Sequence, residues 1–335
     1  MRKYVKNSSF LIGSLFILLL LIFSFIYTFY LKDIIKKPPT LLYDQNGKLL
    51  ATYPYPPSLR FLFGVDRQGQ DVFWLVIDGA KYTILLAMIV SFLRVLFGML
   101  FGIIYGVYLQ KFKFIFQALE RAFRFVPAVL LVLLFFQVNF ITPMGQGMTM
   151  LISQIILLTV VALPPLTNII GNEVSFYSKN DFITSSKLMG GSNIWIIRRH
   201  VIPFLKSRLL LLYVQQVIQV LLLLVHLGVF HLVVGGSFSV NTIDGNSVTV
   251  SLSNEWSGLI GLSYVELMLD KWIVIGPSIG FILTILAFTL IKKGIENANL
   301  SPQKTGKKEK HSTIQLSNNT SLDFSFAFKG VKENH

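Results

Sequence analysis

The stretch TILLAMIVSFLRVLFGMLFGIIYGVY, residues 83–108, is almost entirely apolar and carries one charge, on Arg94. A helix that crosses the hydrocarbon core of a bilayer needs about 20 predominantly apolar residues. The rest of the chain is similar, because 53% of its 335 residues are hydrophobic and 14% are charged, which is unusual for a soluble domain. The sequence therefore predicts an all-α integral membrane protein with six transmembrane helices, at 9–31, 83–108, 125–141, 148–170, 209–234 and 272–291.

The first apolar run, 9–31, has two interpretations, a membrane anchor and a cleaved signal peptide. The run exceeds 20 residues and lacks a small-residue cleavage site, whereas a signal peptide has a shorter apolar core and such a site. We interpret 1–31 as a cytoplasmic N-terminal end followed by a retained anchor. A cleaved signal is the less favoured alternative.

The distribution of Lys and Arg predicts which loops face the cytoplasm, because basic residues beside short loops resist translocation. The segment 236–271 is mainly acidic and 139–147 has no charge, so both are expected outside. The segment 32–82 is also predicted outside although it carries seven basic and five acidic residues, since long loops have little weight in this rule. The prediction is a multi-pass protein of the cell (plasma) membrane with both termini cytoplasmic. The basic residues that support it are Arg2, Lys3, Lys6, Lys111, Lys113, Arg121, Arg124, Lys179, Lys187, Arg198, Arg199, Lys206 and Arg208.

The parts outside the apolar runs differ in character. Extracellular segment 32–82 contains a predicted β-hairpin at 40–53, turning at Asn46-Gly47. Within the core, residues 83–299, the extracellular insert 236–271 contains a second predicted hairpin at 237–253, turning at Asp244-Gly245. The last segment, 300–335, is polar and poor in aromatic residues, which predicts a disordered cytoplasmic tail.

Several function classes lack support in the sequence. It contains no G-x-x-x-x-G-K-[ST] phosphate-binding loop, no H-E-x-x-H and no G-x-S-x-G motif. The net charge of +14 is spread over loops without a nucleic-acid-binding signature, and the absence of cysteine excludes disulfides and thiolate metal ligands. We therefore expect no catalytic residue, no bound metal or cofactor and no nucleic-acid partner.

A polar loop, 175–205, separates the fourth and fifth apolar runs and contains DFITSSKLMGGSNIWIIRRHVIP, residues 181–203. Asn180 or Asp181 can cap a short helix that ends at the double glycine, because glycine adopts the left-handed conformation that terminates helices. Ser192 can cap the next helix, which runs toward Pro203. Helical spacing places Phe182, Ser186 and Met189 on one face of the first helix. On these grounds alone, an ordinary amphipathic elbow at the membrane surface is equally possible.

The same loop resembles the cytoplasmic signature of ABC importer permeases, which reads Glu-Ala-Ala, three residues, Gly, about nine residues and Ile-Leu-Pro. Thr184, Ser185 and Ser186 stand at the Glu-Ala-Ala positions, Gly190 at the glycine, and Val201-Ile202-Pro203 at the end. Arg199-His200 before that ending is similar to the oligopeptide and dipeptide branch.

A second motif supports the resemblance. GVDRQGQD, residues 64–71, is similar to the Gly-Thr-Asp-x-x-Gly-Arg-Asp that precedes the second span in C-type subunits of that branch. The matching positions are Gly64, Asp66, Gly69 and Asp71, and the resemblance covers most of 61–299. Three features depart from the family pattern: Thr184 replaces the glutamate, Gln70 replaces the arginine, and the hairpin at 237–253 is an addition.

The resemblance implies a six-helix permease of the ABC type I importer kind, which forms half of a pore with a homologous second permease. Two cytoplasmic ATPase subunits use ATP and Mg, and an extracellular solute-binding protein delivers cargo, with oligopeptides or dipeptides as the leading class. Metal chelates are an alternative cargo, and a degenerate, non-transporting scaffold or sensor is an alternative function. The first loop helix would be the coupling helix that contacts an ATPase. The resemblance assigns to the coupling loop Phe182, Thr184, Ser185, Ser186, Met189, Gly190, Gly191, Arg199, His200 and Pro203.

Polar or small residues inside the apolar runs suggest further roles. Arg94 is expected to face the bundle interior or a watery path, because charge in hydrocarbon is costly; it could bind a cargo carboxylate or pair with a polar group of a partner chain. His226 and His231 are poor metal ligands at a spacing of five and are interpreted as helix-packing or pore-polar residues. Three glycines spaced by four predict a close approach of another helix: Gly98, Gly102 and Gly106.

Overall fold

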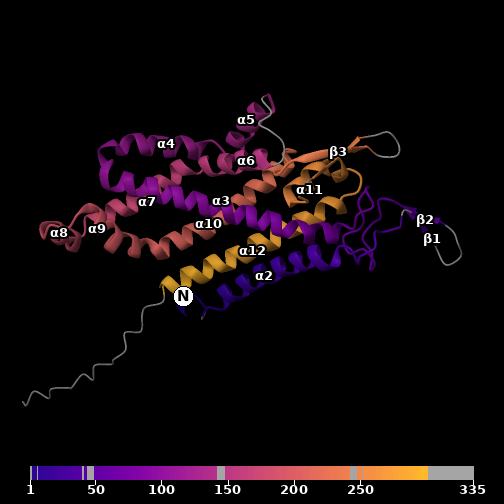
Figure 1. Cartoon of the computed structure of the whole chain (residues 1–335), viewed down its shortest axis with the longest axis horizontal. Helices are drawn as coiled ribbons and strands as arrows, with labels where there is room; N and C mark the ends of the chain where they lie inside the picture. The colour runs from indigo at the N-terminus through magenta and orange to yellow at the C-terminus, as the bar shows by residue number, and fades with distance from the viewer. Residues whose placement is uncertain are drawn as a thin grey trace, which may run out of the picture. The chain divides into compact units, whose positions relative to one another are not determined.

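A computed structural model describes residues 2–5, 7–39, 41–43, 49–141, 148–241, 247–251 and 253–300. Residues 1–300 form one compact unit, and the predicted tail lies outside the described residues. The unit is mainly helical (Figure 1). Its α-helices are α1 (Arg2–Val5), α2 (Ser8–Ile26), α3 (Val72–Tyr108), α4 (Lys113–Phe125), α5 (Ala128–Ile141), α6 (Met148–Val160), α7 (Leu163–Ser178), α8 (Asp181–Leu188), α9 (Asn193–Ile196), α10 (Ile202–Val229), α11 (Trp256–Leu262) and α12 (Trp272–Leu300).

Two π-helical and two 3₁₀ segments join or extend these helices. The π segments are η1 (Tyr27–Leu31), which extends α2, and η3 (Ile197–Val201), which joins α9 to α10. The 3₁₀ segments are η2 (Gln110–Phe112) and η4 (Tyr264–Leu267).

Four helices of the described residues are long and apolar enough to cross a membrane: Ser8–Leu31, Val72–Tyr108, Asn193–Val229 and Trp272–Leu300. A fifth span is formed if α6 and α7 are taken together, with a bend of 45° between them. The bend follows from Pro164 and Pro165, which have no N–H for the preceding turn. Six full spans are therefore not confirmed.

The expected span at 125–141 is the one that the helices do not reproduce. Pro127 separates α4 from α5, and the residue before a proline is driven out of the helical conformation, as Val126 shows with ψ 119°. The helix α5 has 14 residues, which corresponds to about 21 Å, short of the roughly 30 Å of a bilayer core. The start of the second span also differs from the prediction. The helix α3 begins at Val72 and not at residue 83.

Two pairs of antiparallel strands lie outside the helices. The strand β1 (Leu41–Tyr43) pairs with β2 (Leu49–Thr52), and β3 (Ser237–Asn241) pairs with β4 (Ser247–Ser251). The predicted turns at Asn46-Gly47 and Asp244-Gly245 lie outside the described residues, so the turn types stay predictions.

Close helix packing involves the three glycines of α3, which face α7. A Cβ atom at Gly98 would lie 2.6 Å from Leu166, one at Gly102 2.9 Å from Ile170, and one at Gly106 2.6 Å from the carbonyl oxygen of Gly171. Real Cβ atoms do not come this close to other heavy atoms. The glycines therefore allow the two helices to touch along their backbones.

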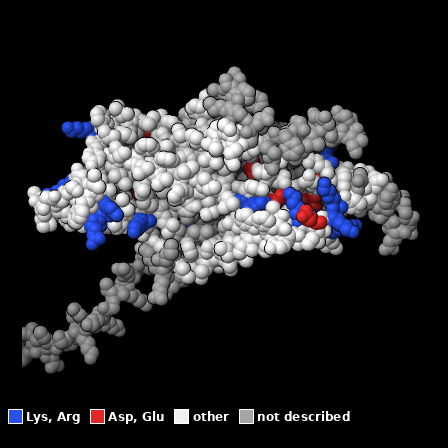
Figure 2. All heavy atoms as spheres, in the orientation of Figure 1, with Lys and Arg blue, Asp and Glu red and all other residues white. Residues whose placement is uncertain are grey.

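Polar groups gather at the two ends of the helices of this unit. In Figure 1, α8 and α9 lie at one end, which we call the loop end, and β1–β4 and α11 lie at the other, which we call the hairpin end. On the face shown in Figure 2, charged side chains cluster toward these ends and the surface between them is mostly uncharged. Such a distribution fits an apolar band in contact with lipid.

Candidate functional site

The loop end contains the segment that the sequence predicts to contact an ATPase. Asn180 occupies the N-cap position of α8 but its side chain makes no capping hydrogen bond. The Ser185 and Ser186 hydroxyls donate to the carbonyl oxygens of Asp181 and Phe182, at 2.9 and 2.8 Å. Two of the three residues at the positions of the Glu-Ala-Ala motif thus use their hydroxyl groups for hydrogen bonds to the backbone of α8.

The joint after α8 has the predicted glycine geometry. Gly190 has a φ of +88°, and no atom lies within 4 Å of the position where a Cβ would stand. The Gly191 N–H donates to the carbonyl oxygen of Ser186 at 3.0 Å, which closes the helix end. Ser192 then caps α9, because its hydroxyl accepts the N–H of Trp195 at 3.3 Å.

The second arm of the loop does not end at Pro203, contrary to the expectation of a proline exit. α9, η3 and α10 form one continuous helical run from Asn193 to Val229. The π segment Ile197–Val201 precedes the proline, which occupies one of the first two positions of α10. Inside a continuous helical run a proline removes one hydrogen bond of the preceding turn, and the π segment lies at that turn.

Buried aliphatic side chains fix the loop to the helices that carry it. Ile183, Ile196 and Val201 are each at most 3% exposed and pack in one cluster with Ile170 and Val174 of α7. Burying aliphatic side chains of this size stabilises the contact by roughly 1.5–3 kcal/mol each. The anchors hold α8 and α9 against the ends of α7 and α10.

The outward side of the same loop is apolar and open. Leu188, Met189 and Ile194 are between 74% and 85% exposed, and Trp195 is half exposed. A hollow of about 430 Å³ opens between the two arms. Its lining consists of Ser186, Met189, Gly190, Gly191, Ser192 and Trp195.

The predicted shared face of α8 is only partly formed. Ser186 and Met189 line the hollow together, whereas the ring of Phe182 packs edge-on against His200, with centroids 5.9 Å apart. Trp195 lies on the same imidazole at 5.2 Å. Sequence reasoning did not single out Trp195, Leu188 or Ile194, although apolar side chains beside a double glycine in a polar loop are a usable signal. Arg199 is exposed beside this cluster.

The motif before the second span forms a closed turn at the hairpin end. Gly64 and Gly69 have φ values of +75° and +71°, and the carboxylate of Asp66 accepts the N–H groups of Gln68 and Gln70 at 2.9 and 2.7 Å. Burial raises the pKa of Asp66 to about 6, although these N–H donors act in the opposite direction. Asp71 caps α3 by accepting the N–H of Phe73 at 2.9 Å, which explains why α3 begins there.

A buried charge network ties three elements together beside this turn. The Asp78 carboxylate of α3 pairs with Lys81 and accepts from Thr28 of η1 at 2.9 Å and from Asn254 at 3.2 Å. Both side chains of the ion pair are at most 7% exposed. Sequence reasoning missed this network, because Asn254 lies 176 positions from Asp78.

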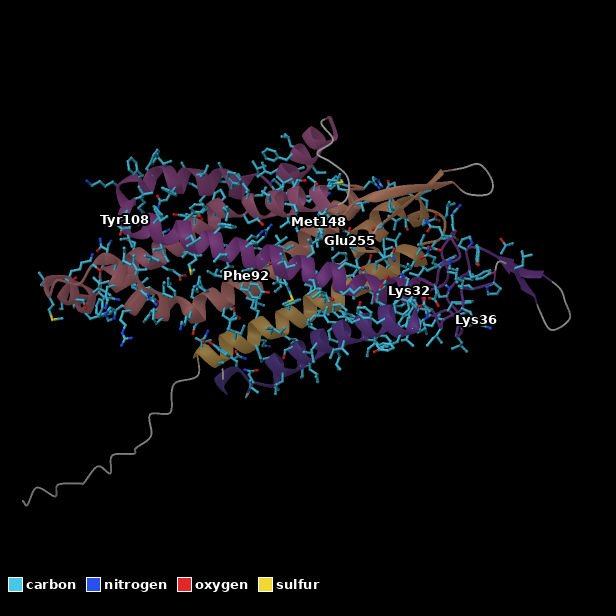
Figure 3. The ribbon with its side chains drawn as sticks, in the orientation of Figure 1. Lys32, Lys36, Phe92, Tyr108, Met148 and Glu255 are labelled. Atoms are coloured by element: carbon cyan, nitrogen blue, oxygen red, sulfur yellow. The ribbon has the colours of Figure 1, made fainter. Side chains whose placement is uncertain are left out.

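The neighbouring Glu255 is fully buried at the start of α11 (Figure 3). Its carboxylate accepts N–H groups of Val234, Ser257 and Gly258, at 3.3, 3.0 and 2.7 Å. Desolvation by burial nevertheless raises the pKa of Glu255 from 4.5 to about 7. Trp256 follows, and its indole N–H donates to the carbonyl oxygen of Val76 at 2.8 Å.

Arg94 is buried in the middle of α3 with partners from its own chain. The guanidinium donates to the carbonyl oxygen of Leu158 at 2.6 and 2.9 Å and to the side chain of Gln216 at 3.2 Å. The Leu158 carbonyl lies at the end of α6. The N–H of Ala162, four residues later, donates to the carbonyl oxygen of Thr159 and not to that of Leu158. Arg94 therefore compensates the break between α6 and α7, and its contact with cargo or with a partner chain stays a prediction.

Metal ligands do not cluster in the described part of the chain: no group of three or more His, Cys, Asp or Glu residues there could hold an ion. The sites consist of helix caps, a charge network and an open apolar loop tip. These features define a multi-pass membrane protein with a structured loop at one end.

No protein-family model matches the chain. It is similar to glutathione transport system permease protein GsiD of Escherichia coli O157:H7 and of Shigella boydii serotype 4, with 24% identity over 251 residues and 75% of each chain covered. The same protein of Escherichia coli O1:K1 / APEC is 23% identical over 250 residues, again with 75% coverage of both chains. The chain is thus homologous to ABC importer permeases of the oligopeptide and dipeptide branch. Permeases of this kind are transporter subunits and not enzymes.

Proposed function

We propose that this permease forms half of the translocation pore of an ATP-driven importer for oligopeptides or dipeptides, and that its loop 181–203 couples the pore to a cytoplasmic ATPase. The observation that carries the proposal is the construction of the loop end. Aliphatic anchors bury one side of α8 and α9, while Leu188, Met189 and Ile194 stay open on the other. A loop that is firmly held yet exposes large apolar side chains has the properties of a protein-binding surface.

The chemistry of the tip indicates how an ATPase would be bound. Thr184 supplies no charge where the family has a glutamate, and its hydroxyl lies 3.5 Å from the carbonyl oxygen of Asn180. Lys187 and Arg198 are exposed at the rim of the tip. The expected groove on the ATPase is therefore apolar at its centre and acidic at its edge.

The proposed cargo class follows from the homology. The relatives carry a name that states transport of glutathione, a peptide derivative. We extend the peptide class, but not that compound, to this chain. In the same proposal a homologous second permease completes the pore, two ATPases bind at the loop end, and a solute-binding protein delivers cargo at the hairpin end. The lipid membrane surrounds the apolar band, and both termini are cytoplasmic.

The absence of cysteine makes the coupling proposal directly testable. Ser186→Cys lines the hollow and is expected to form a crosslink with a cysteine placed in the groove of the partner ATPase. Leu19→Cys, exposed on α2, is the matched control and should form none. ATP-dependent uptake of a labelled dipeptide by cells or proteoliposomes with the complete transport system tests the cargo class.

Two results would overturn the proposal. If Ser186→Cys never captures the ATPase while the complex is intact, the loop is not the coupling element. If the complete system hydrolyses ATP but takes up no peptide, the scaffold or sensor alternative is favoured instead.

A further inference from the structure

One face of α10 carries polar side chains that reach the surface within a membrane span. Gln215 is partly buried, and Gln219 and His226 are exposed. Together with Leu222 they follow a spacing of four, three and four residues, which places them in one line along the helix. We call Gln215, Gln219 and His226 the polar stripe.

The polar stripe is unlike the exposed face of the neighbouring span α3. Every exposed side chain of α3 is apolar or aromatic, from Tyr82 through Phe92 to Tyr108. An amide transferred from water to hydrocarbon without a hydrogen-bond partner costs roughly 2–7 kcal/mol. Gln215 makes no side-chain hydrogen bond within the described residues. The polar stripe is therefore unsuited to contact with lipid.

A chain of hydrogen bonds from the buried core orients the stripe. Arg94 donates to the side-chain oxygen of Gln216 at 3.2 Å, and the amide nitrogen of Gln216 donates to the side-chain oxygen of Gln219 at 2.9 Å. His226 Nδ1 lies 2.6 Å from the carbonyl oxygen of Leu222. Because a carbonyl only accepts, Nδ1 donates this hydrogen bond, which leaves Nε2 outside it. Groups held in this way are preorganised to bind a ligand or water.

We propose that the polar stripe lines the aqueous path that cargo follows through the assembled pore. Its groups donate and accept hydrogen bonds without a fixed charge on either amide, so they suit uncharged polar groups such as the amides of a peptide backbone. Arg94 acts as a positioning residue, because it orients Gln219 through Gln216. The inference deepens the proposed function and depends on it.

Cysteine labelling of the complete transporter in cell membranes tests the path. A cysteine thiolate, which forms in water and not in lipid, attacks the sulfur of a methanethiosulfonate reagent and forms a mixed disulfide as methanesulfinate leaves. Gln219→Cys and Gln215→Cys should react with a charged, membrane-impermeant methanethiosulfonate. Phe92→Cys is the matched control, because it is exposed on α3 two residues from Arg94, which contacts α10 at Gln216. Labelling at least about tenfold slower is expected there, given the need for ionisation.

Each outcome bears on the inference. The inference would be overturned if neither Gln215→Cys nor Gln219→Cys reacts with the reagent, with or without ATP, in a complex that still transports a labelled dipeptide. The polar stripe would then be covered by the second permease. If the wild-type complex transports no dipeptide, the proposed function is overturned instead. The labelling would then still show whether water reaches the polar stripe.

A second measurement addresses contact with cargo. Gln219→Leu, which keeps the size but removes the amide, should reduce peptide uptake about threefold to tenfold, the typical effect of one hydrogen bond. Leu286→Gln, exposed on α12, should not reduce uptake in this way. Equal uptake by wild type and Gln219→Leu would overturn the contact.

Discussion

The loop end and the hairpin end are held together by different interactions. At the loop end, α8 and α9 rest on aliphatic anchors such as Ile183, and their outward side is apolar and open. At the hairpin end, a buried ion pair, the carboxylate of Glu255 and the indole of Trp256 join distant segments through hydrogen bonds. The loop end leaves apolar side chains open, as a protein-binding surface would, whereas the hairpin end fixes one arrangement of the chain by buried hydrogen bonds.

The difference predicts how each end responds to mutation. Buried hydrogen-bonded charges are costly to disturb singly, because each leaves its partner unpaired. Exposed apolar side chains contribute little to folding and much to binding. Substitutions at the hairpin end should therefore reduce stability, and substitutions at the loop tip should reduce transport.

The largest effect is expected for Asp78→Ala, which leaves Lys81 charged and buried without its partner. The substitution should destabilise the protein by about 3–5 kcal/mol. The midpoint of thermal unfolding of the purified protein in detergent, followed by tryptophan fluorescence, measures the loss. The double variant Asp78→Ala with Lys81→Met should recover much of it. An unchanged midpoint for Asp78→Ala alone would show that the network does not hold the hairpin end.

The next effect is a dependence of stability on pH at Glu255. Its pKa is about 7 in the folded protein and 4.5 ordinarily, so the folded state binds the proton more tightly. Stability is then highest below pH 4.5 and falls by about 3 kcal/mol as the pH rises toward 7.

Unfolding midpoints at pH 5 and pH 8 measure this dependence, and Glu255→Gln should flatten it. A wild-type midpoint that rises over this range, with the same slope in the variant, would contradict the assignment to Glu255. Glu255 would then no longer count, beside the ion pair of Asp78 and Lys81, as a buried group that holds the hairpin end.

A smaller effect is expected at the joint of the loop end. Gly190→Ala places a side chain at a φ of +88°, which costs about 1–2 kcal/mol. No atom surrounds the new Cβ, so the strain stays local. The ratio of peptide uptake to ATP hydrolysis should fall while the unfolding midpoint drops by only a few degrees. Ile183→Ala is the contrasting variant, because it opens a cavity and should cost about 2–4 kcal/mol.

The smallest effect on stability is expected for Trp195→Ala at the loop tip. The change should lie within about 0.5 kcal/mol, as for surface substitutions, because the ring is half exposed. Transport should nevertheless fall about tenfold or more if the ring is an anchor for the ATPase. A large loss of stability with normal transport would reverse the comparison between the ends.

Local signals predicted the loop end well and the hairpin end poorly. The joint at Gly190 and the cap at Ser192 depend on neighbours within a few residues, so the sequence indicates both. The span at 125–141 is not confirmed, because the prediction followed its apolar composition and did not weigh the break at Pro127.

Long-range partners could not be predicted from the pattern. The interior position of Arg94 follows from its charge, but its partner Leu158 becomes available only because α6 ends at the bend. Glu255 gives no sequence signal of burial, since its partner Val234, 21 positions earlier, approaches it only in the folded chain.

The glycine contacts between α3 and α7 have a mechanical consequence. α7 leads directly into α8, and α3 extends for 37 residues, or about 55 Å, from the loop end to the cap at Asp71. With backbone against backbone at Gly102 and Gly106, the pair behaves as one stiff rod. In the proposed transporter, this pair would carry a displacement of the loop tip along α3 toward the hairpin end.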